Sequence, residues 1–428
     1  MKLAIIGSSP IACEAAVRFH LHGAAITWFN HEVIEPESLF KSAVIDWKSR
    51  SSEMGRGFLA RAGVTVPSGT WTWKDWKNYS LNMAGLLKAD QEIKPHPVVT
   101  VTKRFLGPGE KIAGKSRFHD LYRVIYQVNP QDFISEQKES DPETYKRLSQ
   151  ELVESLQTTL EMYEDFDLIL DLRRPSVAKS IAHSGRALGE YKMGQDKVTY
   201  GLETLTRLQT FTSNNIREVA LVGSGALAAE ILIEMQEWLK DERTRLFVIS
   251  TEEDPFAEFL SECLKETAVK LRQVFQYMED EFEKEIEVFT KKLRDWQELD
   301  DFVQVKIPKP TEPIPRLNYF SGHNVTAIDL LIDKRRLFLT LERPDFRDGK
   351  KHPENNNLEL KTIGVDEILV ANGFDKVEMK IGLDGNEVGF FSLTPEEILR
   401  ANSWENDLAK LKGIEDEIFK LFSPTGTH

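Results

Sequence analysis

Two stretches of the chain share one order of apolar and polar positions. In the first, the apolar run at residues 3–6 predicts a strand buried on both faces, and Gly7 follows where the chain must turn. Small and apolar residues then recur at helical spacing from residue 11 to residue 19, and Gly23 stands where this helix should end. A second apolar run at residues 24–29 predicts another strand. The pattern therefore predicts a β-α-β unit within residues 1–30.

The second stretch repeats this order further along the chain. Residues 219–222 predict a buried strand, Gly223 begins the turn, residues 226–235 continue a buried helix face, and residues 246–249 predict the next strand. Each copy combines a strand, a glycine turn, a helix of small residues and a second strand. This is the arrangement of dinucleotide-binding units, and two copies are stronger evidence than a single glycine motif.

The turn of such a unit follows the pattern G-x-G-x-x-G, in which each place has a physical role. The first glycine permits the sharp turn, the second lets the backbone approach a pyrophosphate, and the third lets helix and strand pack closely. The helix N-terminus supplies free N–H groups and a favourable dipole. In the second copy the three places hold Gly223, Gly225 and Ala228, so this copy is close to the ideal pattern.

The first copy departs further from the pattern. Its three places hold Gly7, Ser9 and Ala12, and Pro10 comes directly after Ser9. Ser9 adds a Cβ atom and a hydroxyl group where glycine leaves room. At the end of the second strand, Asn30 replaces the acid that usually binds the ribose; it still forms hydrogen bonds but carries no charge. Two interpretations stay open: a unit that binds a dinucleotide, and a unit that keeps the fold and binds nothing.

A third interpretation treats the first residues as a secretory signal that ends in a lipid-anchored Cys13. Only the four apolar residues at positions 3–6 follow Lys2, whereas a secretory segment needs about 7–15. Lipoprotein signals usually carry an aliphatic residue three places before the cysteine, and that position is Pro10. The sequence therefore favours the β-α-β unit.

With both copies taken together, the sequence resembles the flavoproteins with two dinucleotide-binding domains. This superfamily includes pyridine-nucleotide-dependent disulfide reductases, ferredoxin reductases and flavin monooxygenases; its N-terminal unit binds FAD, and an inserted second unit binds NAD(P)H. Two alternating strands at residues 324–346 match its meander. Ala371, Asn372 and Gly373 match the Ala-Thr-Gly where the chain crosses back toward the flavin. The resemblance implies that Ala371 and Gly373 lie beside a cofactor.

The chain also differs from this superfamily. The strand that leaves the first domain ends in Asp171, Leu172 and Arg173 instead of Ala-Thr-Gly, and no clear Gly-Asp motif closes the FAD site near the C-terminus. The chain has two cysteines, Cys13 and Cys263, with no Cys-x-x-Cys pair. Thiol–disulfide exchange needs a pair of thiols, so the sequence excludes a dithiol disulfide reductase.

The resemblance implies an α/β fold, a Rossmann-like three-layer FAD/NAD(P)-binding architecture with two nucleotide-binding domains and a helical insertion. We expect residues 1–212 and 304–428 to form a discontinuous FAD-binding-like domain. Residues 213–303 are expected to form an inserted NAD(P)-binding-like domain with a long helix at residues 266–300. The apolar stripe of this helix is rich in aromatic residues, which indicates a lid, a homo-oligomer interface or a surface for another partner.

Composition narrows the class of protein. The chain has 428 residues, 41% of them apolar and 29% charged, as in soluble globular proteins of two or more domains. Its formal net charge of −14 argues against general nucleic-acid binding. No window reaches the ~18 uninterrupted apolar residues of a membrane span. The low cysteine content favours a cytoplasmic location, and no histidine spacing indicates a metal site.

The expected function is that of a flavoprotein oxidoreductase or monooxygenase in which NAD(P)H reduces FAD and an unidentified acceptor is reduced in turn. Acidic residues at 252–254 favour NAD over NADP, unless they only begin a solvated helix. His183 is the candidate catalytic residue, and the tryptophans at positions 71–76 form either a ligand wall or a satellite core. The alternative is a non-catalytic protein that senses a nucleotide or scaffolds a partner through residues 266–300.

Overall fold

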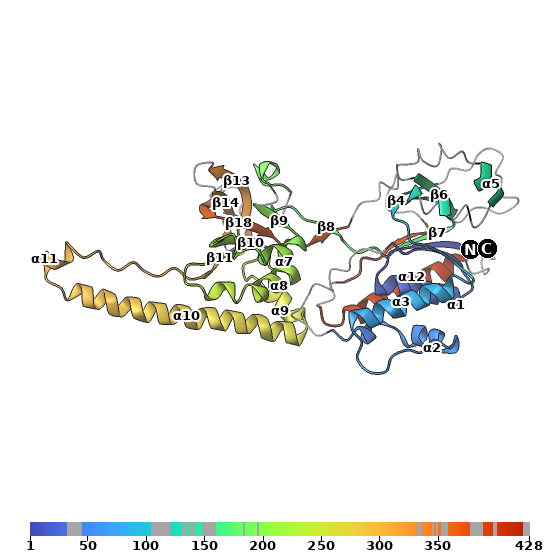
Figure 1. The fold of residues 1–428 in the computed structure, drawn as a ribbon, viewed down its shortest axis with the longest axis horizontal. Coiled ribbons are helices and arrows are strands. Elements are labelled where there is room, and N and C mark those ends of the chain that lie inside the picture. The colour runs from blue at the N-terminus through green and yellow to red at the C-terminus, as the bar shows by residue number, and fades with distance from the viewer. Residues whose placement is uncertain are drawn as a thin grey trace.

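The computed structural model contains two parallel sheets, which follow one another along the long axis of the molecule (Figure 1). The two-stranded ribbon of β8 (Val177–Ala178) and β19 (Phe374–Asp375) lies between them. The structure describes residues 1–31, 45–103, 121–130, 134–135, 138, 142–147, 160–182, 185–194, 197–331, 336–344, 346–347, 350–351, 358–376, 388–396 and 400–422.

All strands of the first sheet run parallel, in the order β20-β7-β1-β2-β3. Leu3 and Ile5 of β1 face a helix layer, and Ala4 and Ile6 face an antiparallel meander, so both faces of β1 are buried as predicted. The five strands are β1 (Lys2–Ile6), β2 (Ala25–Phe29), β3 (Glu92–Lys94), β7 (Leu168–Asp171) and β20 (Phe390–Ser392). The helices are α1 (Pro10–Leu21), α3 (Trp73–Leu87) and α12 (Ser403–Phe422), and the meander is β4 (Val98–Lys103), β5 (Tyr122–Val128) and β6 (Leu160–Phe166).

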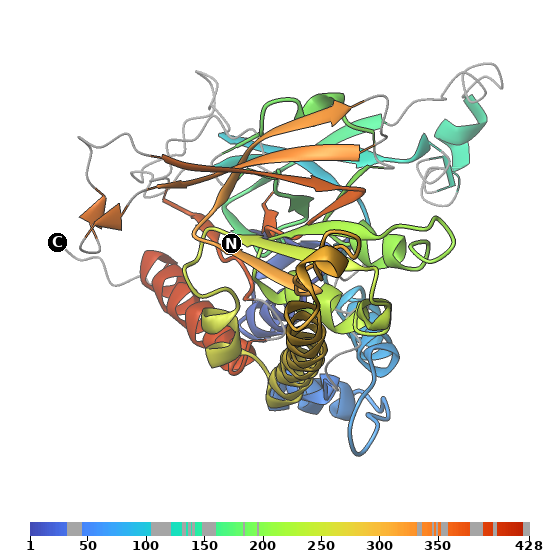
Figure 2. The same ribbon diagram turned by 90° about the vertical axis from the view of Figure 1, so that its left-hand side faces the viewer.

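The second sheet repeats this design in the order β12-β11-β10-β18-β9, again with parallel strands. Its strands are β9 (Val198–Tyr200), β10 (Glu218–Val222), β11 (Arg245–Ser250), β12 (Leu317–Ser321) and β18 (Glu367–Val370). One face packs on α7 (Glu203–Leu208), α8 (Ala226–Glu234) and α10 (Lys265–Gln297), and the other on β13 (Asn324–Leu331), β14 (Arg336–Pro344) and β17 (Leu358–Val365). The view along the long axis shows antiparallel strands above and helices below (Figure 2).

The remaining described elements are short. They are η2 (Trp47–Arg50), α2 (Glu53–Arg61), α5 (Pro142–Arg147), η3 (Glu190–Lys192), η4 (Trp238–Lys240), α9 (Ala257–Glu262), α11 (Asp301–Gln304), β15 (Phe346–Arg347) and β16 (Lys350–Lys351). The expected three-layer α/β architecture is confirmed.

The second sheet contains strands from outside residues 213–303, the range expected for the inserted domain. Strands β9, β12 and β18 all lie outside that range and still pair within the sheet. The meander of β13, β14 and β17 also packs on this sheet, because Val325 and Leu337 share an apolar cluster with Ala220 and Val222. The expected domain boundaries at residues 212 and 304 therefore leave out part of the second sheet. Parallel strands require crossover connections, so neighbouring strands of this sheet come from distant segments of the chain.

Helix α10 confirms the long helix predicted at residues 266–300, and its 33 residues span about 50 Å. Its first half packs on the second domain through buried residues that include Leu271, Val274 and Met278. Its second half projects away from the first domain, and residues 305–316 return alongside it (Figure 1). No helix among the described residues is both long and apolar enough to cross a membrane.

The tryptophans at positions 71–76 pack within the first domain. Trp71 and Trp76 are buried, and the Trp73 ring stacks on the Trp76 ring with centroids 5.1 Å apart. Trp47 packs against Trp73 at 4.5 Å, and Trp71 packs against Tyr79 at 5.3 Å. These rings belong to the same apolar cluster as Leu3 and Ile5 of β1, so they are part of the main core of the helix layer and not a separate satellite core.

Replacing Leu221 with alanine tests the packing of β10. The side chain is fully buried, so we expect the Leu221→Ala variant to lose about 2–5 kcal/mol of unfolding free energy in urea denaturation. Leu360→Ala is the control: Leu360 is 62% exposed on β17, and its loss should change stability by no more than about 0.5 kcal/mol. Equal effects of the two substitutions would contradict this account of the core.

Candidate functional site

The first glycine turn lies at the carboxyl edge of the first sheet, where β1 has β2 on one side and β7 on the other. Gly7 has a φ of +138°, a conformation that L side chains rarely adopt. A Cβ atom on Gly7 would stand 2.8 Å from the carbonyl oxygen of Leu172, at the end of the neighbouring strand. The Leu172 N–H in turn donates to the Ile6 carbonyl oxygen at 2.8 Å. Only glycine fits between the turn and this crossing segment.

The second glycine turn repeats this geometry at the carboxyl edge of the second sheet. Gly223 has a φ of +121°, and a Cβ atom there would overlap the carbonyl oxygen of Ala371. The Ala371 N–H donates to the Val222 carbonyl oxygen at 2.8 Å, as Leu172 does to Ile6. Both turns lie at a point where the strand order reverses, which is where open α/β sheets bind ligands.

The two helix N-termini differ in their unused N–H donors. In α8 the first donor used within the helix is the N–H of Ala229, which bonds the Gly225 carbonyl oxygen at 3.0 Å. In α1 the N–H groups of Ala12 and Cys13 both bond the Ser9 carbonyl oxygen, and Pro10 has no N–H at all. The second unit therefore offers an anion more free backbone donors than the first.

Ser9 and Gly225, which occupy the second place of the glycine pattern in the two units, differ in solvent exposure. Gly225 is exposed, and a Cβ atom there would have no neighbour within 4 Å, so the space in front of α8 is open. Ser9 is buried, and its hydroxyl donates to the Leu172 carbonyl oxygen at 3.1 Å. Ala12 and Ala228 are both fully buried, as the third place of the pattern requires for close packing.

The ends of the second strands present polar groups beside each turn. Asn30 follows β2 half-buried, with its backbone N–H bonded to the Lys94 carbonyl oxygen at 2.9 Å. In the second unit, the Ser250 hydroxyl lies 2.9 Å from the Ser224 hydroxyl and accepts the Glu252 N–H at 3.1 Å. The serine pair thus links the turn of the second unit to the end of β11.

A charged cluster occupies the crossover of the first unit. The buried Asp171 carboxylate binds Arg173 at 2.9 Å and Lys376 at 3.0 Å, and Lys376 also donates to the Ser392 hydroxyl at 2.9 Å. Burial lowers the pKa of the Lys376 ammonium group below its ordinary value, although Asp171 opposes this effect. Two cations share one carboxylate here, so the corner beside Gly7 carries an excess positive charge in an acidic protein.

The crossover of the second unit is neutral. Ala371 is buried, and the Asn372 side-chain amide donates to the carbonyl oxygens of Ser180 and Ile181, each at 2.9 Å. Gly373 follows with a φ of +88° and open space around it. The side chain of Asn372 thus holds the two crossing segments together.

The predicted residues gather in two groups. Gly7, Ser9, Pro10, Ala12 and Asn30 lie at the carboxyl edge of the first sheet. Gly223, Gly225, Ala228, Ala371 and Gly373 lie at the corresponding edge of the second sheet.

Two further sequence candidates have different outcomes. His183 lies outside the described residues, so its role as a candidate catalytic residue stays a prediction. Cys13 is buried in the helix layer, and burial raises the pKa of its thiol to about 12. Its environment suits packing rather than redox chemistry.

Trp28 supports the first turn, and the sequence pattern did not identify it as part of the site. Its indole N–H donates to the Gly7 carbonyl oxygen at 2.8 Å, and the ring is fully buried. The Ser224–Ser250 pair plays a similar part in the second unit and was missed as well. In the sequence, Ser224 is recognisable only because it lies between Gly223 and Gly225. Trp28 and Ser250 are recognisable only because they lie near the ends of predicted strands.

Both turns fit a dinucleotide in the sense that a glycine cradle, a helix N-terminus and a strand-order reversal coincide. The second unit fits better, because it has open space at Gly225 and more unused N–H groups. Among the described residues, no group of three or more histidine, cysteine or acidic side chains is placed to hold a metal ion.

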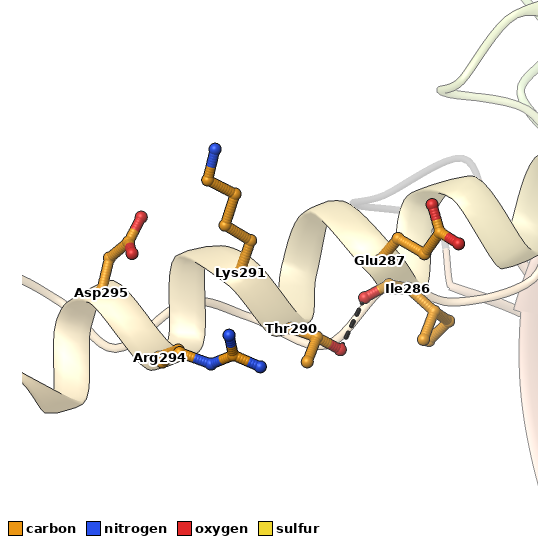
Figure 3. A pocket seen from close by; sticks show the side chains of 6 residues that line it. All are labelled: Ile286, Glu287, Thr290, Lys291, Arg294 and Asp295. Carbon is orange, nitrogen blue, oxygen red and sulfur yellow. Dashed lines mark hydrogen bonds between the residues drawn. The ribbon is translucent and has the colours of Figure 1, made fainter.

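A shallow groove of about 470 Å³ lies elsewhere, on the projecting half of α10 (Figure 3). Its walls come from one helix: Ile286, Glu287, Thr290, Lys291, Arg294 and Asp295. The groove is remote from both glycine turns, since this half of α10 extends away from the junction of the domains (Figure 1).

Comparison with solved structures finds similar folds. The cadaverine monooxygenase of desferrioxamine biosynthesis from Erwinia amylovora is 10% identical, with a TM-score of 0.50 over 98% of this chain and 94% of that chain. Ornithine N-hydroxylase from Kutzneria sp. 744 is 15% identical, with a TM-score of 0.48 over 98% of both chains. L-lysine 6-monooxygenase from Pseudomonas syringae is 12% identical, with a TM-score of 0.49 over 99% of both chains.

These findings concern the fold. The likeness to the cadaverine monooxygenase shows that the chain shares the fold of that protein, in agreement with the Rossmann-like α/β architecture that the sequence resemblance implied. No protein-family model matches the sequence, and no curated protein matches it.

A substitution at Gly225 tests the second turn. Its φ of −86° is allowed for any residue, so Gly225→Ala should fold normally but place a methyl group where a pyrophosphate would approach. We expect NADH binding, measured by calorimetry, to weaken about tenfold or more. Gly85→Ala, at an open position on α3, should leave binding unchanged. Unaltered NADH affinity in the Gly225→Ala variant would rule out this turn as the binding site.

Proposed function

We propose that the protein is an FAD-dependent oxidoreductase of the monooxygenase type that uses NAD(P)H to reduce its flavin. The observation that carries the proposal is the pair of glycine turns, each held against a crossing segment at a strand-order reversal. A protein with a single nucleotide site has no need of the second turn. The cadaverine monooxygenase with the same fold was solved bound to FAD, which supports assigning FAD to this chain.

The first unit is assigned to FAD and the second to the nicotinamide dinucleotide. FAD would be held by Gly7, Ser9, Pro10, Ala12 and Asn30. The nicotinamide dinucleotide would be held by Gly223, Gly225 and Ala228, with Ala371 and Gly373 at the crossing between the sites.

The chemistry divides between cofactor and protein. When bound, the flavin would accept a hydride from the nicotinamide and pass electrons to an acceptor. The chain itself would bind and orient the two dinucleotides. The excess positive charge at Asp171, Arg173 and Lys376 favours an anionic phosphate group beside the first turn, where Pro10 and Ser9 reduce the number of backbone donors.

The nicotinamide cofactor is proposed to be NAD rather than NADP. Acidic side chains follow β11 at Glu252 and Glu253, and a 2′-phosphate prefers arginine at this place. Arg343 does lie near the strand end, but its guanidinium is paired with the Glu253 carboxylate at 2.7 Å. A 2′-phosphate would therefore have to compete with a carboxylate for this cation.

A second candidate function is nucleotide binding without turnover. The features that favour it are the missing N–H of Pro10 and the Ser9 hydroxyl, which is turned toward Leu172. A protein with only the second site would retain a nicotinamide dinucleotide and leave the first unit empty.

The visible absorption spectrum of the purified protein separates the two candidates. The proposed oxidoreductase should carry, or take up on addition, about one FAD per chain, and its flavin bands should bleach on anaerobic addition of NADH. Free FAD mixed with NADH at the same concentrations is the control. A colourless protein that fails to take up FAD would refute the proposal, and retention of NADH without flavin would support the second candidate.

A further inference from the structure

Two backbone hydrogen bonds join the loop that follows β11 to the turn that follows β12. The Gly322 N–H donates to the Glu252 carbonyl oxygen, and the His323 N–H donates to the Ser250 carbonyl oxygen, both at 2.9 Å. Since β11 pairs with β10, this loop and turn lie at the same carboxyl edge of the sheet as the Gly223 turn. Dinucleotide-binding units contact the adenosine ribose at the end of this second strand.

An ion pair lies across this edge, and its cation comes from a different layer. Arg343 belongs to β14 of the antiparallel meander, and its guanidinium pairs with the Glu253 carboxylate at 2.7 Å. Both groups lie over Gly322: a Cβ atom there would stand 2.8 Å from a Glu253 carboxylate oxygen and 3.2 Å from Arg343 Nε. Gly322 has a φ of +69°, a conformation that favours glycine. The meander thus contributes an arginine to the edge of the second sheet.

The charges around this pair are predominantly negative. Glu252 and Asp254 flank Glu253 in the loop after β11. Glu359 stands opposite Arg343 in the register of β14 and β17, and its carboxylate binds Lys361 at 2.8 Å. While Arg343 stays paired with Glu253, this edge disfavours the doubly charged 2′-phosphate of NADP.

The pair is accessible to a ligand. The Glu253 side chain is 60% exposed and that of Arg343 is 39% exposed. An exposed ion pair contributes little to folding stability, so the fold does not depend on keeping it intact. A released guanidinium would present a fork of N–H donors that matches a phosphate group, whereas the ribose hydroxyl of NAD needs only an acceptor oxygen.

We propose that Glu253 is the residue that excludes NADP from the second unit, because it holds the arginine that a 2′-phosphate would bind. This inference rests on the proposed binding of a nicotinamide dinucleotide by that unit. Selectivity is then set by a carboxylate that occupies Arg343, and not by the lack of a cation. Neutralising Glu253 is sufficient to admit NADP, with no positive charge added to the chain.

Calorimetric titration of the full chain with NADH and with NADPH tests the role of Glu253. The wild type should bind NADPH about tenfold or more weakly than NADH. Glu253→Gln keeps an acceptor oxygen for the ribose hydroxyl and releases Arg343. Its affinity for NADPH should rise about tenfold or more, and its affinity for NADH should change by less than about threefold. Adenosine 2′,5′-bisphosphate, which carries the 2′-phosphate and no nicotinamide, should show the same gain as NADPH.

A double variant separates the release of Arg343 from the loss of a negative charge. Arg343→Gln, added to Glu253→Gln, should remove the gain in NADPH affinity. Glu258→Gln is the matched control: it removes the same charge from α9, where Glu258 pairs with Arg400 at 3.7 Å, and should leave both affinities unchanged. Retained NADH binding reports correct folding of each variant.

The outcomes distinguish this inference from the proposed function. NADH binding without a gain in NADPH affinity in Glu253→Gln would overturn the inference and leave the proposed function standing. A gain that persists in the double variant, or that Glu258→Gln shares, would also overturn it, because charge alone would then explain the gain. So would a wild type that binds NADPH as tightly as NADH. A wild type that binds neither dinucleotide would refute the proposed nicotinamide site and this inference together.

Discussion

The close approach of a glycine turn to the carbonyl of a crossing segment is the contact on which both units depend. Gly7 meets Leu172 and Gly223 meets Ala371, with the same backbone hydrogen bond beside each contact. This approach sets where the chain leaves the strand, and therefore where the following helix begins. The helix N-terminus, the crevice at the strand-order reversal and the crossing between domains all take their positions from it.

The two units share this contact and differ in what surrounds it. The second unit has open space at Gly225, a neutral crossover and several free N–H groups. The first unit has a buried serine, a proline at the start of its helix and a cluster of two cations with Asp171. Backbone donors and a side-chain positive charge are two ways to stabilise an anion, and the units differ in their balance between them.

The sequence predicted what is local. Gly7 and Gly223 could be found because a buried strand, a turn and a helix follow one another within a few residues. The membership of β12 and β18 in the second sheet could not be predicted, because an apolar run does not encode which distant strand lies next to it. The hydrogen bond from the Trp28 indole N–H to the Gly7 carbonyl oxygen could not be predicted either, because it depends on how two strands and a turn are placed in three dimensions.

The most direct test of two independent sites is calorimetric titration of the flavin-free protein with FAD and with NADH, in the wild type and in Gly7→Ala and Gly223→Ala variants. Each substitution strains one turn and presses a methyl group against one crossing carbonyl. The account predicts that Gly7→Ala loses FAD and keeps NADH, and that Gly223→Ala does the reverse, so that the retained ligand reports correct folding. Competition of the two ligands for one site, or a Gly7→Ala variant with unaltered FAD affinity, would contradict it.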